Sequence, residues 1–146
     1  MAKKAAGGEL PALKQTLRGA GLRATPSRAA VLKLLRQAST PMSHGEVADA
    51  LAPSGWDRAT LYRNLLDLTR VGLAHRTDVG DHVWRFEATQ EGHDSIGHPH
   101  FVCNECGTVA CLDGATVVLP RGSRAPRSVR DGGVEIQVKG LCDRCN

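Results

Sequence analysis

The sequence predicts an α+β protein in two parts: short helices with a β-hairpin, then a small β-sheet whose strands end in cysteine pairs. Leucines recur at helical spacing over residues 10–71, and strand-like patterns take over from residue 73. Short helices followed by a hairpin are the order of a winged helix-turn-helix. We therefore place a winged-helix domain at 1–88, a polar hinge at 89–97 and a second domain at 98–146.

The first two helices have recognisable boundaries. A helix over about 10–19 carries leucines three and four residues apart, and glycines follow it. Thr25 is a good N-cap, and Pro26 suits the first position of a second helix, because proline lacks the N–H that this position leaves unpaired.

The next two helices form the predicted DNA-reading unit. Ser43 and Glu46 have capping-box spacing at the start of a third helix. Asp57 caps a fourth helix, about 58–71, with four apolar residues on its inner face. Its other face is expected to lie in the DNA major groove and carries Arg58, Thr60, Tyr62, Arg63 and Asn64. The alternative is a helical bundle whose polar face is only solvated.

Strand patterns fill most of the remaining chain. Residues 73–77 and 82–87 predict a hairpin around a Gly-Asp turn. Three later segments predict a three-stranded antiparallel sheet, with an open, arginine-rich loop at 120–133 before the last of them: 98–103, 108–112 and 133–140.

Two CxxC pairs predict a structural zinc site. Cys103 with Cys106 and Cys142 with Cys145 place paired thiolates at two tight turns, and four thiolates complete the tetrahedral shell of structural Zn²⁺. Disulfides or unliganded thiols are the alternative. The N-terminus has no apolar signal-peptide core, and no run approaches the roughly 20 apolar residues of a membrane span. We expect a cytoplasmic protein with reduced thiols and no membrane partner.

The charge is unevenly distributed. The net charge is +4. Residues 1–88 hold 13 Lys and Arg against 8 Asp and Glu, whereas residues 89–146 hold 6 against 7. A basic N-terminal half suits a polyphosphate partner such as double-stranded DNA, although a solvated basic face is the simpler alternative.

A second metal site is predicted between the two domains. His98 and His100 lie two apart on one strand, so their imidazoles share a face. Cys111 is left over from the zinc site, Glu87 ends the hairpin, and His44 begins the third helix. These five residues could hold a regulatory ion whose occupancy biases the angle between the domains. The alternatives are surface histidines, a buried thiol and a solvated carboxylate.

Four blocks of sequence resemble the ferric uptake regulator family of homodimeric, metal-responsive bacterial repressors. They are LRATPSR at 22–28, ATLYRNL at 59–65, HPHFVCNECG at 98–107 and GLCDRC at 140–145. The resemblance spans about 13–145. It implies a winged helix that binds a palindromic operator and a C-terminal α/β dimerisation domain.

The resemblance also assigns individual residues. Tyr62 and Arg63 match the family's DNA-contacting pair, and Arg23 matches a residue placed at the minor groove. Arg28 lies in the same motif, and we include it among the DNA-binding candidates. Three ligands of the family's regulatory site match His98, His100 and Glu87, and Cys111 falls where the family often has an acidic ligand.

The chain departs from the family at several positions. The family's histidine from the DNA-binding domain falls near Pro41, so using His44 assumes a shift of three residues. A second family ligand set meets Pro99 and Val134, which argues against that site. Pro120 and Pro126 argue against a regular dimerisation helix.

The function predicted from these observations is metal-dependent repression of metal-homeostasis or oxidative-stress genes. Zinc suits a site that includes a thiolate, and iron or manganese suits it equally without Cys111. The chain is not expected to be an enzyme. The alternatives are a zinc hydrolase and a zinc-stapled interaction module.

Overall fold

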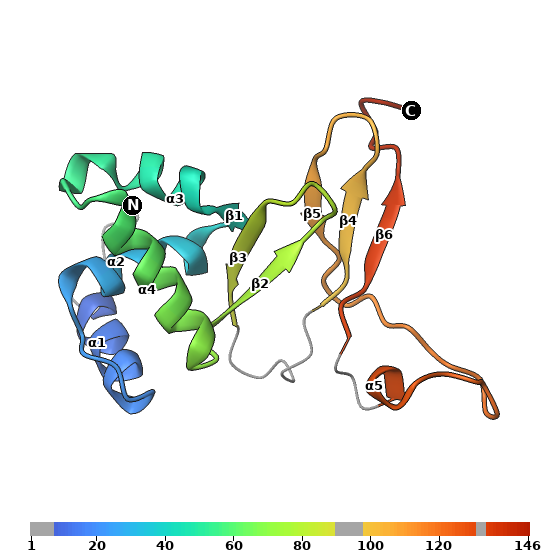
Figure 1. Cartoon of the computed structure of the whole chain (residues 1–146), viewed down its shortest axis with the longest axis horizontal. Helices are drawn as coiled ribbons and strands as arrows, with labels where there is room; N and C mark the ends of the chain where they lie inside the picture. The colour runs from blue at the N-terminus through green and yellow to red at the C-terminus, as the bar shows by residue number, and fades with distance from the viewer. Residues whose placement is uncertain (1–7, 90–97, 131–133) are drawn as a thin grey trace.

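The structure is a computed structural model that describes residues 8–89, 98–130 and 134–146. Helices α1 to α4 lie together on one side, a hairpin follows them, and a second small sheet lies beyond the hairpin (Figure 1). The elements in chain order are α1 (Glu9–Gly19), α2 (Pro26–Gln37), β1 (Met42–Ser43), α3 (His44–Ala50), the 3₁₀-helix η1 (Ala52–Ser54), α4 (Arg58–Arg70), β2 (Ala74–Asp78), β3 (Trp84–Ala88), β4 (His100–Cys103), β5 (Val109–Cys111), α5 (Arg127–Arg130) and β6 (Gln137–Gly140).

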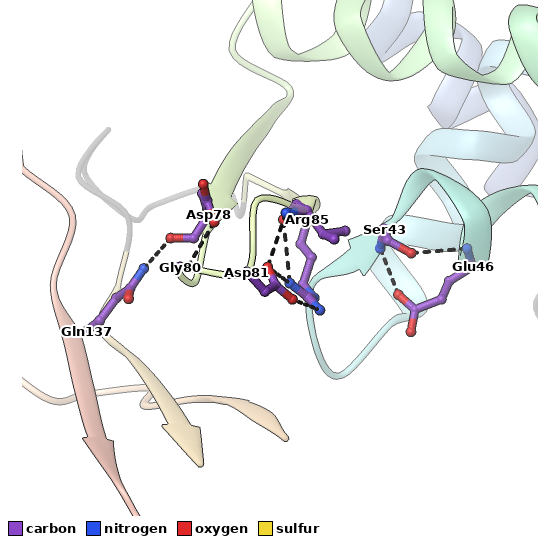
Figure 2. Close-up of polar contacts among 8 residues, drawn as sticks. Ser43, Glu46, Asp78, Gly80, Asp81, Arg85 and Gln137 are labelled. Carbon is purple, nitrogen blue, oxygen red and sulfur yellow. Dashed lines mark hydrogen bonds and ion pairs between the residues drawn. The ribbon is translucent and has the colours of Figure 1, made fainter. Parts of the chain in front are cut away.

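Helices α2, α3 and α4 begin at the residues that the sequence indicated. The Thr25 hydroxyl accepts a hydrogen bond from the Arg28 N–H, and the Asp57 carboxylate accepts one from the Thr60 N–H. At α3, Ser43 and Glu46 form the complete capping box, drawn in Figure 2. Each cap satisfies N–H groups that the first helical turn leaves unpaired.

The N-terminal half has one apolar core. Fifteen buried residues from α1 to α4 and the hairpin form a single cluster. Leu32, Leu65 and Phe86 are at most 1% exposed. Burying a side chain of this size contributes about 2 kcal/mol. This core fixes α4 on the helical layer with its opposite face outward.

The winged helix contains one strand that the sequence did not indicate. β1 pairs with β3, so the first sheet has the order β1-β3-β2 and all its pairs are antiparallel. With only Met42 and Ser43, β1 is too short to show a period of two. It joins the start of α3 to the hairpin.

The second sheet has the three predicted strands, in the order β5-β4-β6, but one pairs in a different direction. β4 and β5 are antiparallel as expected, whereas β4 and β6 are parallel, so the sheet is mixed rather than wholly antiparallel. The parallel direction agrees with the positions of the two CxxC pairs. One pair begins at the C-terminal end of β4 and the other shortly after the C-terminal end of β6. Parallel pairing of these strands places both pairs at the same edge of the sheet.

The turn of the β2–β3 hairpin contacts the second sheet. Val79 is 7% exposed and packs in a small cluster with Val102 and Val109. The Gln137 side-chain amide donates to the Asp78 carbonyl oxygen at 2.6 Å, a contact visible in Figure 2. The two halves therefore touch at the tip of the hairpin.

Two other predictions concern connecting segments. The hinge at 89–97 lies, apart from Thr89, outside the described residues. The loop expected at 120–133 is open over its described part except for α5, which is only 4 residues long. In the described part of the chain, no helix combines the length and apolarity needed to cross a membrane.

Candidate metal centres and DNA-binding face

Four sulfur atoms converge at one end of the second sheet. The Sγ atoms of Cys103, Cys106, Cys142 and Cys145 all lie within 4.8 Å of one another. Cys103 ends β4, opposite Gly140 of β6 in the parallel register, so the two CxxC turns lie side by side. The Cys103 sulfur also accepts the Cys142 N–H at 3.4 Å.

The protonation of this cluster fits a bound cation. Hydrogen bonds from Thr108, together with the neighbouring Cys103 and Cys142, lower the pKa of Cys106 to about 6. The side chains of Cys142 and Cys106 raise the pKa of Cys145 to about 12. Four thiolates within 4.8 Å of one another repel, so all four ionise together only around a cation. Four thiolates around one point suit Zn²⁺.

A second cluster lies where the two halves meet. Ligand atoms of Glu87, His98, His100 and Cys111 lie within 4.8 Å of one another. Glu87 comes from β3, whereas the other three come from the second sheet or the residue leading into it. His100 Nε2 and His98 Nε2 each lie 2.9 Å from a Glu87 oxygen, and the Cys111 thiol donates to the carboxylate at 3.3 Å.

His75 also reaches this cluster, and the sequence analysis missed it. His75 pairs with Glu87 across the hairpin, and its Nε2 lies 3.3 Å from a Glu87 oxygen. Its ring centroid is 6.3 Å from that of His98 and 6.4 Å from that of His100. A symmetric hairpin centred on Asp81 places residues 75 and 87 opposite each other. The expected hairpin register could therefore have identified His75 as a neighbour of Glu87 from the sequence.

The surroundings of the second cluster shift the pKa values of its two acidic side chains in opposite directions. Burial opposes ionisation of Glu87, but contacts with His100, His75 and Cys111 outweigh it and hold the pKa of the carboxyl well below its usual range. Burial and the Glu87 charge raise the pKa of Cys111 to about 12.

Several ring nitrogens at this site have no hydrogen-bond partner among the described residues. They are His75 Nε2, His98 Nε2 and His100 Nδ1, and all three are buried. The Nε2 atoms of His75 and His98 approach Glu87 without hydrogen-bond alignment. The Nε2 atoms of His75 and His98 thus lie beside the Glu87 carboxylate, to which the Cys111 thiol also donates. This set of donors matches the ligand preferences of divalent zinc, iron or manganese.

His44 is not brought to this cluster, contrary to the expectation from sequence. Its Nε2 lies 2.8 Å from the Arg58 carbonyl oxygen, and its ring lies 5.1 Å from that of Tyr62. His44 therefore joins α3 to the start of α4. The sequence analysis used His44 in place of the family's histidine near Pro41, which assumed a shift of three residues. The structure places His44 in the helical layer and not at the metal cluster.

Three of the residues proposed to read DNA are exposed and free of ion pairs within the described chain. Tyr62 is 37% exposed, and Arg63 and Arg23 are exposed as well. Arg58 is exposed and forms an ion pair with Asp49 at 3.0 Å. Thr60 is partly exposed, and its hydroxyl donates to the Asp57 cap at 2.6 Å.

Two DNA-binding candidates are corrected by the structure. Asn64 is 4% exposed, and its amide donates to the Ser27 hydroxyl at 3.0 Å. Arg28 Nη2 lies 2.6 Å from Asp67, and Nη1 donates to the Arg23 carbonyl oxygen. Both contacts join α2 to α4, since Ser27 and Arg28 lie on α2 and their partners Asn64 and Asp67 lie on α4. Adjacent helical residues differ by about 100° in direction, so Asn64 turns inward beside the outward Arg63.

Comparison with known proteins identifies a family and several relatives of this chain. Residues 19–121 match the model of the ferric uptake regulator family. The chain is 30% identical to the peroxide-responsive repressor PerR of Staphylococcus saprophyticus and 29% identical to that of Staphylococcus aureus. Each alignment spans 135 residues, or 89% of this chain and 86% of the relative.

Solved structures share the fold. The Vibrio cholerae ferric uptake regulator matches with a TM-score of 0.63 at 24% identity over 88% of this chain and 98% of its own. The Helicobacter pylori regulator, described as having three functional metal-binding sites, matches with a TM-score of 0.65 at 16% identity over 99% and 97%. A zinc uptake regulator solved with zinc and DNA matches with a TM-score of 0.60 at 20% identity over 92% and 91%.

Proposed function

Because this chain belongs to the ferric uptake regulator family, we propose that it is a metal-responsive transcriptional repressor whose sensing site joins its two halves. The observation that carries this proposal is the position of Glu87. It lies on the DNA-binding half but contacts three side chains of the second half within 3.3 Å. Occupancy at such a site acts on the arrangement of the two halves.

The proposed sensing ligands are His98, His100, Glu87 and Cys111, with His75 as a further nitrogen donor. A divalent ion bound here supplies the positive charge that offsets the Glu87 carboxylate and a Cys111 thiolate. The β3 strand carries Glu87, and the β4–β5 pair carries His100 and Cys111 opposite each other. Holding these strands together fixes α4 relative to the second sheet, since α4 packs on the hairpin.

The zinc site formed by the four cysteines has a separate, structural role. It ties the ends of β4 and β6 together in a sheet that contributes only Val102 and Val109 to the described apolar cluster. A closed shell of thiolates leaves no open position for a reacting ligand. The similar proteins named above are regulators, and none of them supports the zinc hydrolase or interaction-module alternatives.

The DNA contacts proposed for this chain are Tyr62 and Arg63, with Arg58, Thr60 and Arg23 beside them. An exposed tyrosine and arginine on successive positions of α4 suit base edges and phosphates of the major groove. Family membership supports a homodimer on a two-fold operator. The thiolate donor favours zinc as the sensed ion, whereas the two staphylococcal relatives are peroxide-responsive.

A paired metal and DNA measurement tests this function. Protein carrying only its cysteine-bound zinc is titrated with Zn²⁺, Mn²⁺ or Fe²⁺ while fluorescence anisotropy follows binding to its promoter DNA. We expect DNA affinity to rise with occupancy of the second site. His100→Ala should abolish this response, whereas His82→Asn, an exposed histidine in the hairpin turn, should retain it. DNA affinity independent of the second ion would contradict the sensing role.

A further inference from the structure

The segment between β5 and β6 carries positive charge that neither the metal sites nor the proposed DNA contacts use. From Pro120 to Arg130 the sequence has four arginines and no aspartate or glutamate. All four arginines are exposed, and within the described residues none of them forms an ion pair. Guanidinium groups this close together without carboxylates create a positive potential that attracts anions.

Three of these arginines line one hollow. Arg121, Arg124 and Arg130 line a hollow of about 460 Å³, and the rest of its lining is formed by Leu119, Pro120, Gly122 and Ser123. Pockets for small molecules range over about 300–1,000 Å³, so the cavity has room for a compact ligand. The lining combines arginine side chains with the apolar Leu119 and Pro120, which suits a charged group attached to a less polar body.

The backbone of the segment defines the hollow. The Ser123 N–H donates to the Pro120 carbonyl oxygen at 3.1 Å, and Gly122 adopts φ +83°, so residues 120–123 form a β-turn. Arg130 Nη2 donates to the Ser123 carbonyl oxygen at 3.3 Å. This bond brings the far end of the segment back to the turn, so arginines from both ends face the same space.

We propose that this arginine hollow binds a small phosphate-bearing anion. The planar guanidinium fork matches the geometry of phosphate oxygens and forms short, charge-assisted hydrogen bonds with them. Figure 1 shows the segment around α5 on the opposite side of the molecule from α3 and α4. That position favours a free anion over the DNA bound at α4. The ligand would therefore bind far from the recognition helix.

Calorimetry with a matched ligand pair tests the proposal. The metal-loaded protein is titrated at fixed ionic strength with AMP and with inorganic phosphate, and adenosine serves as the ligand without a phosphate. We expect saturable binding of the phosphorylated ligands only. The double variant Arg121→Gln, Arg124→Gln should bind about tenfold or more weakly, because it loses charged hydrogen bonds. Arg36→Gln, an exposed arginine on α2, should bind like the unmodified protein.

The other outcomes are equally informative. Zinc content and circular dichroism establish that the double variant is folded, as expected for changes in an exposed loop. Absence of saturable binding by either phosphorylated ligand, or equal affinity in the double variant, would overturn the proposal. Loss of promoter affinity in the double variant, without AMP or phosphate binding by the unmodified protein, would assign the arginines to DNA phosphates instead. None of these outcomes depends on the metal-sensing function.

Discussion

At the scale of single residues, Glu87 is the centre of the proposed sensing site. Its carboxylate lies within 3.3 Å of ligand atoms from His75, His98, His100 and Cys111, and only 13% of its side chain is exposed. A buried carboxylate remains ionised only with compensating partners. His100 and Cys111 make hydrogen bonds to the carboxylate, and the ligand atoms of this cluster are suitable for a metal ion.

Glu87→Gln separates the charge of this residue from its size. The amide occupies nearly the same volume but coordinates a cation less strongly, so the second ion should bind at least about tenfold more weakly. Competition with a chromophoric chelator measures the affinity. The cysteine-bound zinc should remain at one ion per chain. Unchanged affinity for the second ion would remove Glu87 from the ligand set.

Cys111 is the only thiol in the proposed sensing site, so it tests the preference of that site among metals. Thiolates favour zinc, and carboxylates favour manganese and iron. Cys111→Asp should therefore lower the ratio of zinc to manganese affinity by about tenfold or more. Parallel chelator competitions with the two ions measure this ratio. If the ratio stays the same, the Cys111 thiol does not bind the ion.

At the scale of elements, α3 and α4 are positioned by their caps and by the core beneath them. The capping box of α3 satisfies two N–H groups, with distances of 3.2 Å to the Ser43 hydroxyl and 2.7 Å to the Glu46 carboxylate. His44 then joins α3 to the first turn of α4. Correct capping of α3 therefore supports the position of α4, the proposed recognition helix.

Ser43→Ala removes the hydroxyl of this capping box. We expect the free energy of unfolding to fall by about 1 kcal/mol, the usual effect of losing an N-cap. Urea unfolding of the zinc-loaded protein measures the change. Ser128→Ala, at an exposed position in α5, should have little effect. Equal stability of the two variants would mean that the capping box contributes nothing.

Arg63→Ala tests the exposed face of α4. Losing an arginine contact with a base or phosphate should weaken promoter binding about tenfold, with the affinity for the second metal ion unchanged. Anisotropy titrations with saturating metal measure the effect. Arg70, an exposed arginine in the last turn of the same helix, provides the control Arg70→Ala. If both variants bind alike, the N-terminal part of α4 is not the reading surface.

At the scale of the whole molecule, the two halves have very different cores. The cluster of the N-terminal half contains 15 buried residues. The other cluster contains Val79, Val102 and Val109, and one of these comes from the hairpin. A sheet with so little buried apolar surface needs a further source of stability, and a tetrathiolate zinc site provides one.

Removing the cysteine-bound zinc should unfold the second half selectively. Under reducing conditions, a strong chelator should abolish hydrogen-exchange protection in β4, β5 and β6, while α1 to α4 remain protected by their own core. Hydrogen exchange read by mass spectrometry, with zinc content measured in parallel, tests this directly. Full protection of the three strands without zinc would show that packing alone holds the sheet.

The sequence by itself determined the features that depend on neighbouring residues. The caps at Thr25, Ser43 and Asp57 are confirmed, as is the order of four helices and a hairpin. The CxxC spacing likewise identified the four-cysteine cluster. These features arise from hydrogen bonds and turns within a few residues of chain, so a short stretch of sequence contains the necessary information.

Only the tertiary structure decided which distant side chains meet. The parallel pairing of β4 with β6 and the contact of Asn64 on α4 with Ser27 on α2 depend on packing between separate segments. His44 shows the same limit, because its metal role assumed a position that the α3–α4 contact excludes. Such contacts are determined by the global minimum of packing free energy, which no local pattern encodes.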